Sequence, residues 1–96
     1  MNIQKDILEN ETILSLQGWL DTEAAGDFGR ELEALEDDGR TLVLNLKDLE
    51  YISSSGVRQI VAAHKKMGGN FVVRNTPDNV FNVFKSIGID KRVKFE

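Results

Sequence analysis

Cysteine is absent from this chain of 96 residues, and histidine, proline, tryptophan and tyrosine occur once each. Without cysteine the protein has no disulfide, no thiolate nucleophile and no cysteine-based zinc site. The single histidine, His64, makes a histidine metal site or a conventional catalytic triad hard to assemble. We therefore expect neither a metal ion nor a cofactor, and the composition weighs against an enzyme.

Long apolar runs are also missing. The opening residues, MNIQKDILENE, contain no apolar core like that of a signal peptide, and no window approaches the ~18 apolar residues of a membrane span. We expect a cytoplasmic protein without membrane insertion. The net charge of −4 opposes direct binding to nucleic acid. With 41% hydrophobic and 29% charged residues, the composition is typical of one soluble domain, residues 1–96.

Apolar periodicity predicts strands that alternate with helices. Strands are expected at 3–8, 12–18, 41–46, 70–75 and 92–96, with helices in three of the intervals between them and a connection at 47–52. The first two strands form a hairpin through Asn10 and Glu11. Because later strands alternate with helices, the crossovers are right-handed and the sheet is mixed but mostly parallel. The fold class is α/β, with helices packed against the sheet.

Capping signals set the expected ends of the first two helices. Asp21 or Thr22 begins the first helix, since a side-chain oxygen there accepts a free amide of the first turn. Gly39 is expected just past its end. The acidic run at 36–38 weakens this helix because the dipole is already negative there. Gly68 and Gly69 end the second helix.

The third helix has the clearest signals. Thr76 is expected as its N-cap, Pro77 as its first helical residue, and Gly88 as the residue just past its end. Its buried stripe is expected to include Phe84 and Ile87.

The segment YISSSGVRQI, residues 51–60, joins a strand pattern to the second helix. Serine is a favoured N-cap, so one of the three serines is expected to cap this helix. One cap does not need three hydroxyls. A phosphoryl group on a first-turn serine is well tolerated, because the amides and the positive dipole end face it. It would add roughly −1.5 to −2 charges to a surface that a partner can touch.

Catalysis by these serines is not expected. A serine nucleophile needs a base within hydrogen-bond reach. His64 lies ten residues after Ser54 on the same expected helix, so about 15 Å separate them. The glycine-x-serine-x-glycine elbow of hydrolases and the lysine of a phosphate-binding loop are missing as well.

The stretch LVLNLKDLEYISSSGVRQIVAAHKKM, followed by GGNFVVRNTPDNVFNVFKSIGIDKRVKFE and preceded by LSLQGWLDTEAAGDFGRELEAL, resembles the STAS domain of bacterial anti-sigma factor antagonists. The resemblance covers nearly the whole chain. It implies a cytoplasmic antagonist that binds an anti-sigma factor with serine kinase activity and so frees a sigma factor. It also implies that this kinase phosphorylates a serine at the start of the second helix, which breaks the complex, and that a serine phosphatase restores it.

Carried onto this chain, the resemblance places the phosphorylation site at Ser54, with Ser55 as the less favoured choice. Ser53 stands where the family motif has an aspartate, which puts recognition by a typical kinase in question although Ser53 can still cap the helix. Gly56 is expected to let a partner approach closely, and Trp19 to serve as an exposed aromatic anchor. The expected partner-binding surface is Asp21, Ser53, Ser54, Ser55, Gly56 and Trp19.

Other interpretations stay open. The same fold can act without phosphorylation, as a scaffold or a transporter-associated subunit, and the missing aspartate favours this alternative. A nucleotide-hydrolysing enzyme has only the sheet architecture in its favour. Many family members carry a further helix after the strand matching 92–96. Without it, we expect bare apolar surface on one sheet face, and a monomer or weak homodimer. His64 is expected to be partly buried.

Overall fold

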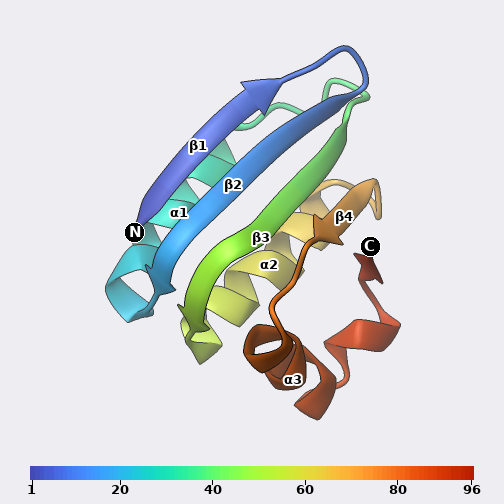
Figure 1. The fold of residues 1–96 in the computed structure, drawn as a ribbon. Coiled ribbons are helices and arrows are strands. Elements are labelled where there is room, and N and C mark those ends of the chain that lie inside the picture. Colours follow the sequence, from blue (N-terminus) through green and yellow to red (C-terminus); the bar gives the residue numbers. More distant parts are fainter.

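A five-stranded sheet in the order β1-β2-β3-β4-β5 organises the protein, and the computed structural model describes residues 1–96 (Figure 1). β1 is antiparallel to β2, and every other neighbouring pair is parallel. The predicted mixed sheet with an N-terminal hairpin is therefore confirmed. The elements are β1 (Asn2–Ile7), β2 (Glu11–Leu20), α1 (Thr22–Ala34), β3 (Thr41–Ile52), α2 (Ser54–Lys66), β4 (Phe71–Arg74), α3 (Asp78–Ser86), a 3-10 helix η1 (Ile89–Lys91) and β5 (Lys94–Phe95).

Helices α1 and α2 lie side by side behind β1, β2 and β3, and α3 lies beyond the end of β4 (Figure 1). The main core fills the space between the sheet and these helices. Phe28 of α1, Ile60 of α2 and Phe84 of α3 are fully buried in it. Alternate residues of β2, such as Leu14 and Leu16, complete it from the sheet, because successive side chains of a strand point to opposite faces.

β3 is longer than predicted: residues 47–52, expected as a connection, continue the strand to Ile52. The register of β3 against β2 shifts twice, between Ser15 and Gln17 and between Gly18 and Trp19, and each shift inserts an extra residue of β3. Such bulges break the two-residue alternation on which the prediction of a strand depends. The prediction failed for that reason.

Of the two predicted caps, Asp21 and Thr22, the structure shows Asp21, because its Oδ1 accepts a hydrogen bond of 2.8 Å from the amide of Ala24. The predicted end at Gly39 is wrong. α1 stops at Ala34, the following Leu35 already has an extended backbone, and Gly39 turns with φ +88° later in the loop to β3. Half-buried Leu35 leaves the helix to reach the core.

Three predictions for α3 are wrong. The helix begins at Asp78, so Pro77 is its N-cap rather than its first helical residue, and no side chain caps it. Thr76, the predicted cap, has its hydroxyl oxygen buried without a partner. Ile87 is 57% exposed because the helix ends at Ser86 and Gly88, with φ +78°, turns the chain there as predicted. Ile89 of η1 occupies the buried position beyond that turn.

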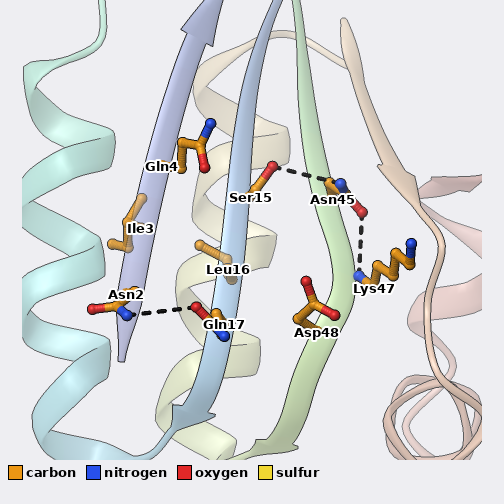
Figure 2. A pocket seen from close by; sticks show the side chains of 9 residues that line it. All are labelled: Asn2, Ile3, Gln4, Ser15, Leu16, Gln17, Asn45, Lys47 and Asp48. Atoms are coloured by element: carbon orange, nitrogen blue, oxygen red, sulfur yellow. Dashed lines mark hydrogen bonds between the residues drawn. The ribbon is translucent and has the colours of Figure 1, made fainter.

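The opposite face of β1 and β2 carries no helix (Figure 1). Most side chains on that face are polar. A hollow of about 230 Å³ lies on this face. Figure 2 shows that amide, hydroxyl and charged side chains make up most of its lining. Further along the same face Val43 is fully buried, and Arg74 of β4 pairs with Glu11 of β2 and with Glu96. The hydrogen bond to Glu96 raises the pKa of Arg74. The bare apolar sheet face expected from the sequence is not found.

Candidate functional site

The ends of β2 and β3 bring two helix starts together. These strands are parallel neighbours, and their last residues, Leu20 and Ile52, are register partners. A backbone hydrogen bond of 2.8 Å from the Ser53 amide to the Leu20 carbonyl joins the two exits. α1 therefore begins after Asp21, and α2 after Ser53, at the same edge of the sheet. This places the predicted Asp21 and the serine segment in one surface region.

The three serine hydroxyls are in three different situations. Ser53 is buried, and its Oγ accepts a hydrogen bond of 3.1 Å from the Gly56 amide, so it is the N-cap of α2. Ser55 is half-buried, and its Oγ accepts a hydrogen bond of 3.3 Å from Nη2 of Arg58. Ser54 is exposed, and its hydroxyl makes no hydrogen bond within the protein. Of the three, only Ser54 is both exposed and without a hydrogen bond to the rest of the protein.

Gly56 faces the interior of the protein rather than a partner. A Cβ at this position would lie 2.7 Å from Cγ of Leu20 and 3.1 Å from Cγ1 of Ile52, which is closer than side chains pack. The missing side chain therefore lets the first turn of α2 approach the ends of β2 and β3. The access role predicted for Gly56 is replaced by an internal role that sets the position of the serine segment.

An exposed aromatic pair lies beside this edge. The Trp19 ring is stacked on the Tyr51 ring with 4.9 Å between centroids and a tilt of 33°, and the two residues are register partners on β2 and β3. Their exposed fractions are 57% and 43%. Sequence reasoning selected Trp19 but missed Tyr51, because 47–52 was not recognised as strand. The signal that could have revealed the pair is an aromatic residue, Tyr51, only three residues before Ser54.

Carboxylates surround the start of α1. Asp21, Glu23 and Asp27 line a shallow pocket of about 260 Å³ together with Trp19. Asp27 also forms an exposed ion pair with Arg30. The first turn of α2, in contrast, contains no acidic residue. A negative charge on Ser54 would therefore be stabilised by the positive end of the α2 dipole, with no carboxylate in the same turn to oppose it.

Other sites that the sequence brought into question lie elsewhere. His64, half-buried as predicted, is near the far end of α2, with its ring edge-on to Phe71 at 6.0 Å. No group of three or more histidine, aspartate or glutamate side chains is arranged to hold a metal ion. None of the helices has the length and apolar character needed to cross a bilayer.

The model of the STAS domain family matches residues 2–96. This chain belongs to the STAS domain family. The anti-sigma-B factor antagonist of Bacillus subtilis strain 168 is 29% identical over 94 residues, which cover 93% of this chain and 86% of that relative. The fold and the family predicted from the sequence are thus confirmed.

Solved structures agree with this assignment. An anti-sigma factor antagonist from Mycobacterium paratuberculosis has a TM-score of 0.87 at 21% identity, covering 98% of this chain and 83% of that chain. SpoIIAA in its unphosphorylated form has a TM-score of 0.81 at 19% identity, covering 99% and 88%. The phosphorylated form of SpoIIAA, from Bacillus, has a TM-score of 0.74 at 18% identity, covering 99% and 91%. At these identities the likeness establishes a shared fold.

Proposed function

We propose that this protein is an anti-sigma factor antagonist: it binds an anti-sigma factor that is also a serine kinase, and phosphorylation of Ser54 ends that binding. The observation that carries the proposal is the free, exposed hydroxyl of Ser54 at the first residue of α2. The name of the Bacillus subtilis relative, an anti-sigma-B factor antagonist, supports the binding of an anti-sigma factor. The existence of a phosphorylated form of SpoIIAA supports the switch by phosphorylation.

The reaction at Ser54 changes charge more than shape. A bond forms between Ser54 Oγ and the γ-phosphorus of a nucleoside triphosphate, and the bond from that phosphorus to the β–γ bridging oxygen breaks. The nucleoside diphosphate leaves, and the hydroxyl proton passes to a base of the kinase. The product carries roughly −1.5 to −2 charges. The dipole of α2 stabilises these charges, so the fold persists. A partner that covered Ser54 would have to bury a strongly hydrated group, and its binding is lost.

We locate the partner-binding surface from the side chains that are exposed near Ser54. Trp19, Tyr51, Asp21 and Ser54 are all exposed at the shared edge of β2, β3 and the two helix starts, and we place the partner on them. Ser53 caps α2 from the interior, so the position lacking the motif aspartate still holds the helix start in place. A serine phosphatase would hydrolyse the phosphate ester and restore binding.

The test is intact-mass analysis and phosphosite mapping of the protein purified from its native cells, with and without phosphatase treatment. We expect one removable phosphate, located on Ser54. Affinity purification should recover an anti-sigma kinase with wild type and with Ser54→Ala, which cannot be phosphorylated, but not with Ser54→Asp. Equal recovery by Ser54→Asp contradicts the proposal. Absence of phosphate under both growth and stress conditions favours the scaffold alternative.

A further inference from the structure

An apolar groove runs along the outer side of α2. Val57, Val61 and Ala62 of α2 form one wall, and Ile87 and Ile89 form the other; the groove measures about 460 Å³. It continues past Val61 and Ile89 into a narrower part of about 180 Å³, which His64 and Val93 close. Ile87 is the most exposed large apolar residue of this half of the chain. The two parts share Val61 and Ile89, so together they form one shallow, elongated groove, which suits an occupant such as a helix.

The rim of the groove is basic. Arg58, Lys65 and Arg92 line it, and none of the three is in an ion pair within the protein. The net charge of −4 conceals a strong separation: residues 1–52 hold thirteen acidic and four basic side chains, and residues 53–96 hold three and eight. The nearby carboxyl of Asp90 has one oxygen buried without a partner. The groove therefore combines an apolar floor with a basic rim.

A second copy of this chain does not supply a suitable helix. The apolar residues of α1, such as Phe28 and Leu32, are already buried in the core, and those of α3, such as Val80 and Phe84, are too. A complementary occupant needs an apolar stripe for the floor and negative charges for the rim. We propose that the groove binds an amphipathic helical segment of the partner, with acidic residues beside its apolar face. This rests on the proposed function, in which a protein partner covers the start of α2.

Arg58 connects the groove to the switch serine. It lies four residues after Ser54, so the two side chains share one face of α2. Its Nη2 now donates to the neighbouring Ser55 at 3.3 Å, which keeps the guanidinium close to the helix start. A phosphate on Ser54 would attract Arg58 as a bidentate partner. The groove would then lose one rim cation and gain a nearby negative charge, so phosphorylation weakens binding of the acidic helix.

The test uses a fluorescein-labelled peptide probe, with leucines at helical i, i+3, i+4 and i+7 spacing and glutamates on the flanks. A matched peptide has lysine in place of every glutamate. Fluorescence anisotropy measures binding to the full chain, and backbone amide NMR shifts locate it. We expect the acidic peptide to bind at least about tenfold more tightly than the basic one and to shift Val61, Ala62 and Ile89, with affinity falling as salt rises.

Groove variants separate docking from general charge effects. Arg92→Glu and Val61→Asp should each weaken binding of the acidic peptide by about tenfold or more. Lys91→Glu makes the same charge change at an exposed residue of η1 that does not line the groove. It should change binding of the acidic peptide by less than about twofold. Equal loss from Lys91→Glu and Arg92→Glu overturns the proposal. Binding of both peptides with equal affinity, or shifts mapped elsewhere, does so as well.

The role of Arg58 is measured by a double-mutant cycle. Ser54→Glu should weaken the acidic peptide several-fold relative to Ser54→Ala, and by clearly less when Arg58 is changed to Gln. If the effects of the Ser54 and Arg58 substitutions on peptide binding simply add, the proposed coupling between the two residues is wrong. The peptide assay needs no kinase, so its failure with a confirmed Ser54 phosphate refutes the groove alone. Peptide binding without any phosphate in cells refutes the switch and leaves the groove as a docking site.

Discussion

The two helices that start at the shared edge of the sheet use the same capping device and finish it differently. At α1, Asp21 caps the Ala24 amide from an exposed position, and Glu23 adds a second negative charge in the first turn. At α2, buried and neutral Ser53 caps the Gly56 amide, and no acidic residue follows. The positive end of α1 is therefore balanced by fixed charges. That of α2 is left for a charge that can be added and removed.

The largest expected effect concerns the close approach of α2 to the strands. Gly56→Ala should lower the free energy of unfolding by about 1–3 kcal/mol, because the added methyl meets Leu20. Gly26→Ala in α1 is the matched control, since a Cβ there approaches only the Arg30 guanidinium, at 3.9 Å. It should raise stability by about 0.5–1 kcal/mol. Urea unfolding monitored by circular dichroism measures both; the same sign for the two would contradict this account.

Removal of either cap should cost stability. Asp21→Ala and Ser53→Ala are each expected to lower the free energy of unfolding by about 0.5–2 kcal/mol, since each leaves one amide of the first turn without its acceptor. The loss for Ser53→Ala should lie at the upper end of this range, because the Gly56 amide that loses its acceptor is buried. The conservative variant Ser53→Asn should recover part of the loss in the same urea titrations. A loss of less than about 0.3 kcal/mol in both alanine variants would show that the caps are incidental.

The opposite ends of the two helices are linked by Lys66. Its Nζ donates to the carbonyls of Leu32 and Glu33, at 2.6 and 3.1 Å, and so neutralises the negative end of α1 from α2. Lys66→Met should lower the free energy of unfolding by about 0.5–1.5 kcal/mol. Lys65→Met, which removes an adjacent charge with no such bonds, should change it by less than about 0.5 kcal/mol. Equal losses of stability in Lys66→Met and Lys65→Met would contradict the role assigned to the Lys66 hydrogen bonds.

The smallest expected effect tests the difference between the two helix starts directly. Ser54 and Thr22 are both exposed first residues of their helices. Ser54→Asp should stabilise the protein by about 0.3–1 kcal/mol, because the carboxylate meets an uncompensated dipole. Thr22→Asp should gain less, since Asp21 and Glu23 already carry charge there. Thermal unfolding at low and high salt is the measurement, and a larger gain at Thr22 would reverse the comparison.

Features set by neighbouring residues were predictable. The cap at Asp21, the stop at Gly68 and Gly69, and the turn at Gly88 depend on side chains and backbone torsions within a few residues. The alternation of strands and helices, and hence the mostly parallel sheet, follows from apolar spacing. These are local properties, and the structure confirms them.

Features set by distant residues were not predictable in the same way. The continuation of β3 to Ile52 depends on pairing with β2 across two bulges, and the end of α1 is held by Lys66, more than thirty residues further along the chain. Trp19 and Tyr51 contact each other only because the register of β2 against β3 makes them partners. Periodicity within a segment contains none of this information.

The serine segment shows the same division within three residues. The sequence by itself determined that a serine would cap α2 and that a free hydroxyl could remain in its first turn, because capping is local chemistry. Only the tertiary structure decided that Ser53 is the cap and Ser54 is free. The Ser53 amide donates to the Leu20 carbonyl at the end of β2, and Gly56 packs closely against Leu20 and Ile52. With these two residues facing the interior, the side chain of Ser54 faces the outside.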